Sequence, residues 1–404
     1  MAVGKVGKFD LMPVGGVRLG TSSAGIRQTL RDDLLLIEIA SGSVCAATFT
    51  RNAFCAAPVL VARQNIAASV RCLIINSGNA NAGTGQAGLE DALRICRFLS
   101  KQLGVREDRI LPFSTGVIGE RLPVEKIESA IPAAINALSP LGWPSAAKAI
   151  MTTDTRPKGV SRQFSTGGRD AVITGIAKGA GMIHPDMATM LCFIATDLCL
   201  DRELLHSCLF RAVDRSFNRI SVDGDTSTND ACVLIATGVA GNPSIDAKSP
   251  ELELISTILE EVCQELAEAI VRDGEGATKL LRIQVGSAAS ETEAKKVAKT
   301  IATSPLVKTA CFASDPNWGR ILAAVGRAGV DRLDINRVAI WLGDLQVVGN
   351  GGLSTNYSES QARKIMSKEE ILIRVELGRG KHRHQELSCD FSYDYVRINA
   401  DYRT

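Results

Sequence analysis

The sequence predicts an α/β fold in which mixed sheets are packed against helices. In the first third of the chain, short apolar runs alternate with clusters of Gly, Ser and Asn, which is typical of strands that end in loops. In two other stretches, apolar residues recur every three or four positions, which is typical of amphipathic helices. Because strands and helices are interleaved without a fixed repeat, we expect one α/β architecture over the whole length.

The size and composition agree with a globular protein of this class. The chain has 404 residues, of which 45% are apolar, 22% charged and 4% aromatic. This composition excludes a disordered, collagen-like or small disulfide-stapled protein. The length suffices for two lobes or one large body, and it allows a core to form without metals or disulfides.

Two apolar runs in the first third predict strands. The first is Val-Leu-Val-Ala at residues 59–62, and the second is Cys-Leu-Ile-Ile at residues 72–75. The second run leads directly into the polar stretch Asn-Ser-Gly-Asn-Ala-Asn at residues 76–81. We therefore expect a strand that opens into a functional loop at this point.

Two segments predict amphipathic helices. Residues 89–103 place apolar side chains at helical spacing and are followed by Gly104, a typical helix stop. After Pro250, the apolar side chains of residues 255–270 form one helical face, which the sequence Asp-Gly-Glu-Gly at residues 273–276 ends.

Charge and cysteine content indicate a cytoplasmic protein with a small-molecule partner. The 46 Lys and Arg residues against 44 Asp and Glu give a net charge of +2, with no long run of one sign, so neither nucleic acid nor an anionic membrane is expected as a partner. The N-terminus lacks an export signal, and no run of about 18 apolar residues predicts a membrane span. The 11 scattered cysteines are expected to be buried, reduced thiols.

The sequence contains no complete nucleotide-binding or calcium-binding motif. No GxxxxGK[ST] sequence occurs, and Gly-Ile-Ala-Lys-Gly-Ala-Gly at residues 175–181 lacks the GxGxxG register. The acidic segment that begins at Asp223 resembles the start of a calcium loop, but it has Thr228 where glycine is needed and Leu234 where a bidentate carboxylate is needed. A structural polar turn is expected there.

The histidines do not assemble a recognisable site. His382 and His384 could face the same way on a strand and bind a metal, but the neighbouring Lys and Arg disfavour a cation, so a solvated basic edge is expected. His184 and His206 stand alone, and no GxSxG sequence marks a Ser-His-Asp triad. We therefore expect no metal and no cofactor.

Residues 178–197 stand apart as a glycine-rich loop that leads into an apolar run. The segment reads KGAGMIHPDMATMLCFIATD. From the residues alone, Thr189 is a β-branched residue at the start of a buried strand and needs no functional explanation. The glycine-rich stretch 175–181 is also the nearest candidate for a domain boundary.

This segment closely resembles the cleavage-site motif of the ornithine acetyltransferase family, the bifunctional glutamate N-acetyltransferases of arginine biosynthesis. Other stretches similar to the family follow in order over essentially the whole chain. They are NSGNANAGTG (76–85), STGVIGE (114–120), MTTDTRPK (151–158), SVDGDTSTND (221–230), DGEGATK (273–279), SPLVKTA (304–310), DPNWGR (315–320) and the terminal YVRINADYRT.

The resemblance implies a precursor that cuts itself between Ala188 and Thr189. Residues 1–188 would form an α chain with the catalytic body and the oxyanion hole, and residues 189–404 a β chain with the nucleophile strand and the C-terminal substrate contacts. The implied fold is a sandwich body of the N-terminal-nucleophile type with a smaller second lobe. Two α and two β chains would associate.

The implied catalyst is the new N-terminal residue, Thr189. Its free α-amine would take the proton of its own hydroxyl, so no histidine is required. An α-amine titrates near about 7.7–8.0, and a nearby ammonium such as Lys178 would lower that value. Before cleavage the same nitrogen is an amide and cannot act as a base, so the uncut chain would be nearly inactive.

The implied reaction carries acetyl from N2-acetylornithine to glutamate in a ping-pong cycle through an acetyl ester of Thr189. Thr115 and Gly116 match the oxyanion stabilisers of the family. From the residues alone, Ser-Thr-Gly at residues 114–116 is only a turn. Acetyl-CoA is a possible second acetyl donor that no motif here includes or excludes.

The implied substrate contacts are a lysine, a carboxylate and neutral polar side chains, which suit an amino-acid ligand. Two of them have an ordinary structural alternative: Glu275, also implied in catalysis, could be a surface glutamate, and Lys178 a solvated loop lysine. Thr404 is the last residue, a position that is usually dispensable. The full set is Thr152, Lys178, Thr189, Glu275, Asn399 and Thr404.

Two residues depart from the family pattern, and two other functions stay open. His184 and Asp186 stand where the family form has Ala and Asn, and His184 could assist the acyl shift or simply face solvent. The same N-terminal threonine chemistry would serve an amidohydrolase or aminopeptidase with water as the acceptor. A non-catalytic ligand-binding protein on the same fold is the other alternative, although Thr189 and the preceding Ala188 are intact.

Overall fold

The computed structural model describes the chain in four stretches, residues 2–4, 9–27, 31–184 and 190–401. The chain divides into two compact units. The larger unit comprises residues 7–218 and 225–270. The smaller unit comprises residues 1–6, 219–224 and 271–404.

The larger unit contains two mixed sheets, with strand orders β1-β2-β4-β5 and β3-β10-β8-β7-β6. Its strands are β1 (Val17–Ser22), β2 (Leu34–Ile39), β3 (Val44–Phe49), β4 (Cys72–Asn79), β5 (Ile110–Val117), β6 (Lys158–Thr166), β7 (Arg169–Lys178), β8 (Leu191–Thr196) and β10 (Ala231–Ala236). Its helices are α1 (Ala57–Asn65), α2 (Gly85–Leu103), α3 (Val124–Asn136), α4 (Trp143–Ala149), α5 (Arg202–Asp214) and α6 (Leu252–Arg272).

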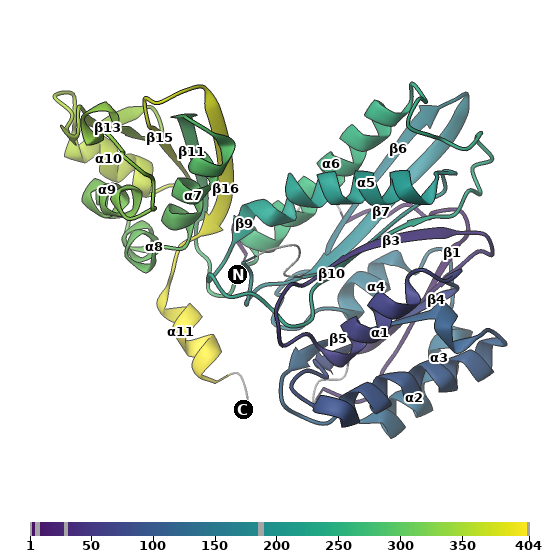
Figure 1. Ribbon diagram of the computed structural model, residues 1–404. Helices are drawn as coiled ribbons and strands as arrows, with labels where there is room; N and C mark the ends of the chain where they lie inside the picture. The colour runs from purple at the N-terminus through teal and green to yellow at the C-terminus, as the bar shows by residue number, and fades with distance from the viewer. Residues whose placement is uncertain (1, 5–8, 28–30, 185–189, 402–404) are drawn as a thin grey trace. The chain divides into compact units, whose positions relative to one another are not determined.

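These elements form four layers, helix, sheet, sheet and helix (Figure 1). The inner faces of the two sheets share one buried cluster, in which Phe113 of β5 meets Phe193 of β8 edge to face with ring centroids 5.2 Å apart. Helices α2 and α3 pack on the outer face of the first sheet, and α5 and α6 lie over the second. Strands buried on both faces explain the continuous apolar runs of the sequence.

The smaller unit is built on one seven-stranded sheet, in the order β14-β13-β12-β15-β11-β16-β9. Its strands are β9 (Ile220–Ser221), β11 (Leu280–Ala288), β12 (Ala339–Leu342), β13 (Leu345–Gly349), β14 (Gly352–Leu353), β15 (Glu370–Glu376) and β16 (His382–Cys389). Its helices are α7 (Glu291–Ala302), α8 (Pro305–Phe312), α9 (Trp318–Gly326), α10 (Glu359–Met366) and α11 (Tyr393–Ala400). Short 3₁₀ turns lie at Glu107–Arg109, Phe217–Arg219 and Ile335–Arg337.

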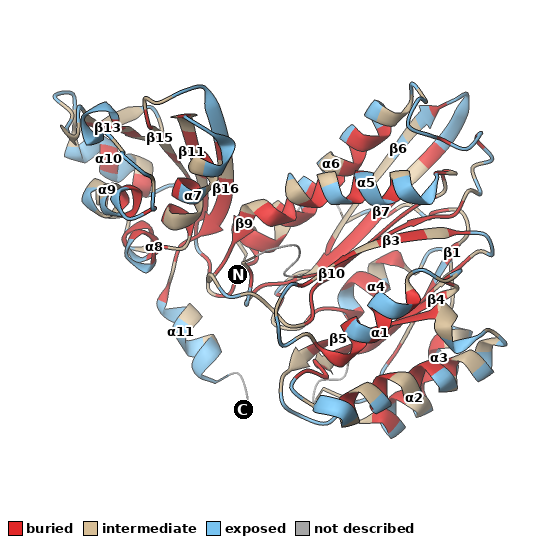
Figure 2. Ribbon diagram, viewed as in Figure 1, coloured by how far each residue is buried: buried red, intermediate tan, exposed pale blue. Residues whose placement is uncertain are grey.

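One face of this sheet is covered and the other is polar. Residues from β11, β12 and β15 share a buried cluster with α7, α8 and α9. Along β15 the burial alternates strictly, so that Ile371, Ile373 and Val375 are buried while the residues between them are partly exposed. Helix α11 contains no buried residue, and Figure 2 shows it in the colours of exposed and intermediate residues.

The predicted α/β class and both predicted helices are confirmed. Helix α2 ends at Leu103 with Gly104 in the left-handed conformation at φ +66°, as its glycine stop predicts. Helix α6 buries the predicted apolar face, including Val262 and Leu266. The run at 72–75 is strand β4, which continues through the polar residues to Asn79.

The predicted strand at residues 59–62 is wrong, because these residues lie in helix α1. A short apolar run has no period that distinguishes a strand from a buried helical turn. Pro58 stands in the first turn of the helix, where a missing N–H costs nothing. Val59 and Val61 are buried while Leu60 is 46% exposed.

The glycine-rich stretch at residues 175–181 is not a domain boundary. Its first four residues belong to strand β7, in the interior of a sheet. A Cβ on Gly175 would lie 3.0 Å from Leu266 Cδ1 and 3.1 Å from Ile194 Cγ1. The glycine therefore lets α6 approach the sheet closely.

Two further sequence-based expectations have mixed outcomes. All 11 cysteines are free thiols, but Cys55 and Cys199 are only partly buried. His382 lies on an exposed edge as expected, whereas His384 is buried at 4% exposure, so the solvated basic edge is wrong for that residue. No described helix has both the length and the apolar character needed to cross a bilayer.

Candidate active site

The end of strand β5 presents Thr115 and Gly116 beside strand β4. Thr115 is 7% exposed, and Gly116 has φ +136°, a conformation that favours glycine. A Cβ on Gly116 would lie 2.2 Å from the carbonyl carbon of Gly78 and 2.5 Å from the backbone nitrogen of Asn79. Only glycine fits here, and the segment predicted as a turn from the residues alone is the end of a strand.

The side-chain amide of Asn229 fixes the direction of this backbone. Asn229 is 6% exposed, and its Nδ2 donates to the carbonyl oxygens of Ala80 at 2.6 Å and Ser114 at 2.9 Å. In a planar trans peptide, the carbonyl of Ser114 and the N–H of Thr115 point in opposite directions. By holding the carbonyl, Asn229 also orients the Thr115 N–H.

Lys178 ends strand β7 and reaches Thr115. Its Nζ donates to Thr115 Oγ1 at 2.9 Å. The structure therefore brings together two predicted site residues that are 63 positions apart in the sequence. The alternative of a fully solvated loop lysine is wrong, since Lys178 is half-buried at a strand end.

The buried carboxylate of Asp154 ties the predicted contact Thr152 to the same strand end. Asp154 Oδ2 accepts from the backbone N–H of Thr152 at 2.9 Å, and Oδ1 accepts from Gly179 N at 2.7 Å. Oδ1 also accepts from Lys158 Nζ at 2.5 Å, in an ion pair whose side chains are 1% and 0% exposed. Thr152 and Lys178 are thus held by one group.

Charge stabilisation outweighs burial at Asp154. Burial alone would raise the pKa of the carboxyl, but Lys158, Lys178 and the hydrogen bonds together hold that pKa well below its usual range. At Asp230, the effect of burial on the pKa is larger than the effect of the neighbouring groups. Burial raises the pKa of Asp230 well above its usual range against the opposing effects of Ser227 and Lys178, which favours the protonated carboxyl.

In the smaller unit, Glu275 and Asn399 meet each other. Asn399 Nδ2, on helix α11, donates to Glu275 Oε2 at 2.8 Å. Glu275 is 6% exposed, so the alternative of an exposed surface glutamate is wrong. Gly276 beside it has φ +68°, and a Cβ there would lie 2.5 Å from the backbone nitrogen of Tyr395, so glycine allows α11 to pack against this loop.

Two polar anchors hold the start of the same helix. Ser392 Oγ donates to the carbonyl of Gly276 at 2.6 Å. Lys308, which is fully buried, donates to Ser388 Oγ at 2.9 Å and to the carbonyl of Cys389, and its Nζ lies 4.4 Å from the centroid of the Phe391 ring. These contacts fix the backbone from which α11 begins.

Several predicted residues cannot be placed. Ala188, Thr189 and Thr404 lie outside the described residues, as does Asp186. His184 is described, and its carbonyl accepts from Thr226 Oγ1 at 3.2 Å. Met190, which follows Thr189 in the sequence, accepts through its carbonyl from Ala231 N at 2.9 Å.

The profile of the ArgJ family matches residues 18–404. The chain belongs to the ArgJ family. It is 59% identical over 394 residues to the arginine biosynthesis bifunctional protein ArgJ of Methylococcus capsulatus strain Bath, covering 98% of this chain and 97% of that protein. It is 51% identical over 405 residues to the protein of the same name in Pseudomonas fluorescens strain Pf0-1, covering both chains in full.

Among solved structures, the arginine biosynthesis bifunctional protein argJ of Bacillus halodurans is 39% identical, with a TM-score of 0.49 over 52% of this chain and 97% of that chain. Ornithine acetyltransferase of Mycobacterium tuberculosis, complexed with ornithine, is 34% identical, with a TM-score of 0.38 over 44% of this chain and 94% of that chain. The family membership confirms the resemblance drawn from the sequence motifs.

Sequence reasoning missed three residues of this candidate site, Asp154, Asn229 and Asp230. All three lie within stretches that carry the resemblance, MTTDTRPK and SVDGDTSTND. Each of the three is an Asp or Asn in a stretch that is buried in the structure. The sequence around them is typical of turns, so their burial could not be predicted from it. Asp154 and Asn229 act by orienting the backbone around Thr115, Thr152 and Lys178.

We predict that Asp154→Asn lowers the free energy of unfolding by about 3–5 kcal/mol, because Lys158 is left buried without its carboxylate. The depressed pKa of Asp154 stabilises the fold above the unfolded-state value of about 3.9, and this stabilisation is lost as the pH falls through the lower folded-state pKa. Urea unfolding from pH 6 downward, roughly to pH 2, should therefore show a weaker acid dependence in the variant.

Asp108→Asn is the matched control, since Asp108 is 38% exposed in a surface ion pair with Arg106. Surface pairs contribute little. Equal losses of stability in the two variants would contradict the role given to Asp154.

We predict that Gly276→Ala displaces helix α11, because the added Cβ meets the backbone of Tyr395. Amide hydrogen exchange in α11 should rise, and the free energy of unfolding should fall by more than the cost of about 1 kcal/mol for a left-handed alanine. Gly329→Ala is the control, since Gly329 also has φ +68° in the smaller unit but faces open space. Equal exchange of α11 in both variants would refute the packing argument.

Proposed function

We propose that this protein transfers an acetyl group from N2-acetylornithine to glutamate through an acetyl ester of Thr189. As a member of the ArgJ family, the chain is an acyltransferase of arginine biosynthesis. The observation that carries the proposal is the group formed by Thr115, Gly116 and Lys178, in which a cation and an oriented strand end meet in a largely buried place.

We propose that activation precedes catalysis. The precursor cleaves itself between Ala188 and Thr189, which gives an α chain of residues 1–188 and a β chain of residues 189–404. The free α-amine of Thr189 then takes the proton of the Thr189 hydroxyl. The family membership and the intact junction sequence support this step.

In the first half-reaction, Thr189 Oγ attacks the acetyl carbonyl carbon of N2-acetylornithine. The C–O bond forms, the carbonyl oxygen becomes an oxyanion, and the hydroxyl proton passes to the α-amine. The amide C–N bond then breaks, ornithine leaves with that proton, and the acetyl ester remains. In the second half-reaction the α-amine of glutamate attacks the ester carbonyl carbon and a C–N bond forms. The ester C–O bond then breaks, and the proton lost by the glutamate amine passes through the α-amine of Thr189 to Thr189 Oγ, which releases N-acetylglutamate and restores the hydroxyl.

Thr115 and Gly116 stabilise the oxyanion in this proposal. The hydroxyl of Thr115 accepts from Lys178, so its own proton remains able to donate to a developing negative charge. Asn229 directs the Thr115 N–H through the Ser114 carbonyl. The positive charge of Lys178 adds favourable electrostatics in surroundings of low polarity.

The remaining predicted residues bind substrate. Glu275 and Asn399 offer a buried carboxylate and an amide, which suit the amine and the amide of an amino-acid ligand. Thr152 and Thr404 complete the proposed set. We further propose that the cleaved chains associate as α₂β₂ in the cytoplasm and that no cofactor is required. The word bifunctional in the names of the relatives supports acetyl-CoA as a second acetyl donor.

The test of the nucleophile is the intact mass of the denatured protein, beside Thr189→Ala and Thr189→Ser. We expect two fragments that split between Ala188 and Thr189 in the native sequence, and a single chain of 43.0 kDa in Thr189→Ala. Thr189→Ser keeps a hydroxyl and should still be cut. An uncut native chain after prolonged incubation would contradict catalysis by an N-terminal Thr189. Turnover of acetylornithine without glutamate would instead identify a hydrolase.

We predict that Thr115→Val lowers the rate of acetyl transfer by about 10²–10³ with little change in the free energy of unfolding, because it removes one oxyanion donor. Thr115→Ser keeps the hydroxyl and serves as the control, with activity close to the native protein. Steady-state kinetics with both substrates measure the effect. A Val variant as active as the Ser variant would exclude the hydroxyl from the oxyanion site.

A further inference from the structure

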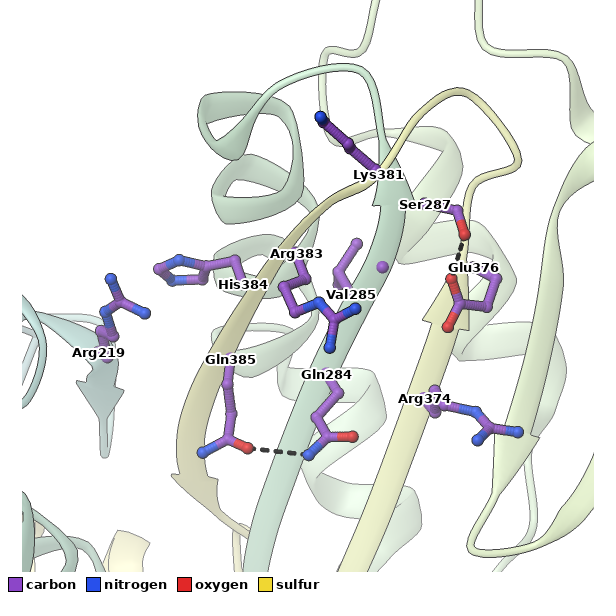
Figure 3. Close-up of a pocket in the computed structure, with 11 residues that line it drawn as sticks. Arg219, Gln284, Val285, Ser287, Arg374, Glu376, Lys381, Arg383, His384 and Gln385 are labelled. Carbon is purple, nitrogen blue, oxygen red and sulfur yellow. Dashed lines mark hydrogen bonds between the residues drawn. The ribbon is translucent and has the colours of Figure 1, made fainter.

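A basic cavity lies in the smaller unit, outside every residue assigned to acetyl transfer. Its volume is about 660 Å³, within the usual range for small-molecule sites. Strands β11, β15 and β16 form its floor (Figure 3). The ionisable residues that line it are Arg219, Arg374, Lys381, Arg383, His384 and Glu376.

Arg219 is paired with Glu291 at 3.2 Å, but the other three cations of this cavity are poorly neutralised by the protein. Lys381 and Arg383 make no hydrogen bond or ion pair with any residue in the described part of the chain. Arg374 lies over the Trp341 ring, 4.4 Å from its centroid, and within the described residues its buried Nε has no hydrogen-bond partner. Within the described part of the chain, Glu376 is the one carboxylate that lines the cavity.

His384 stands beside the cavity but is buried on the other face of the sheet. His384 is 4% exposed, and its Nε2 lies 2.9 Å from Glu386 Oε1. Its Nδ1 has no hydrogen bond within the described chain, and Glu291 Oε1 lies 4.0 Å from it. Figure 3 shows the ring extending from β16 toward Arg219. His384 pairs with Val285, which belongs to the buried core beneath α7, so the ring lies on the helix-covered face of the sheet and the cavity's cations lie on the other face.

The backbone at the cavity is distorted in a way that holds Glu376 in place. The pairing of β11 with β16 shifts register between Val285 and Ala288, and Ser287 has φ +49°. Ser287 Oγ donates to Glu376 Oε2 at 2.6 Å, while a Cβ on Gly286 would lie 2.6 Å from the same oxygen. Bulges with left-handed residues often shape functional sites.

We propose that this cavity binds a small phosphorylated ligand that carries at least two negative charges. The phosphate oxygens lie against Arg383, Lys381 and Arg374, since a guanidinium matches phosphate geometry in a fork of two hydrogen bonds. Arg374, Lys381 and Arg383 against Glu376 leave two positive charges, and a single carboxylate on the ligand would balance only one of them. Glu376 accepts a hydrogen bond from a hydroxyl or amine of the ligand, and this acceptor favours an organic phosphate over the free ion.

The first test is calorimetric titration of the full purified chain with ADP and with inorganic pyrophosphate. We expect saturable binding with one ligand per chain, and affinity that falls as ionic strength rises. Tighter binding of ADP than of pyrophosphate assigns the site to organic phosphates, whereas equal affinity assigns it to the free ion. The absence of saturable binding of either ligand up to about 10 mM would overturn the proposal.

The second test uses charge variants of opposite expected sign. The double substitution Lys381→Gln and Arg383→Gln should weaken binding by about tenfold or more, and Glu376→Gln should tighten the binding of pyrophosphate several-fold. Lys364→Gln with Lys368→Gln removes the same charge from exposed positions outside the cavity and should leave the affinity within about twofold. Acetyl transfer should be unchanged in both double variants.

Two results of the second test contradict the site. One is equal binding by the cavity variant and its control. The other is a change of mass in solution that occurs only in the cavity variant, which would assign this face to contact between copies of the chain.

Discussion

One buried carboxylate organises the candidate active site of the larger unit. Taking Asp154 and Lys158 out of water costs several kcal/mol for each ion, and their attraction together with the backbone N–H groups of Thr152 and Gly179 offsets that cost. Because Gly179 directly follows Lys178, the same carboxylate fixes the end of β7 from which the lysine reaches Thr115. The orientation of the half-buried Lys178 thus depends on the buried ion pair of Asp154 and Lys158.

In the smaller unit, helix α11 positions Asn399, and this helix is held differently from the end of β7. Helix α11 buries no residue, and its apolar contacts include the ring pairs Tyr393–Phe312 and Tyr395–Phe391. Gly276 lets the helix approach closely, and the Ser392 hydroxyl donates to the Gly276 carbonyl. The Asn399 amide donates to the Glu275 carboxylate. An eight-residue helix is too short to persist alone in water. The placement of Asn399 therefore depends on a small number of contacts. Loss of one of them would change the structure mainly at α11.

The sequence predicts the parts of this fold that carry a long period or an unambiguous stop signal. Helix α2 with Gly104 and helix α6 with its apolar face are of this kind. Residues 59–62 have no such period, and Gly175 serves packing where a boundary was expected. The motifs gave the types of the site residues. That Lys178 meets Thr115, or that Glu275 meets Asn399, follows only from tertiary pairing.

The burial of the thiols has a consequence for handling and probing the enzyme. Alkylation and oxidation require a thiolate, and burial raises the pKa of Cys45, Cys96 and Cys311 to about 12. In the folded protein, reagents therefore reach chiefly the partly exposed Cys55 and Cys199. The other nine thiols become reactive when the protein unfolds. Their labelling therefore measures unfolding and does not measure modification of a catalytic group.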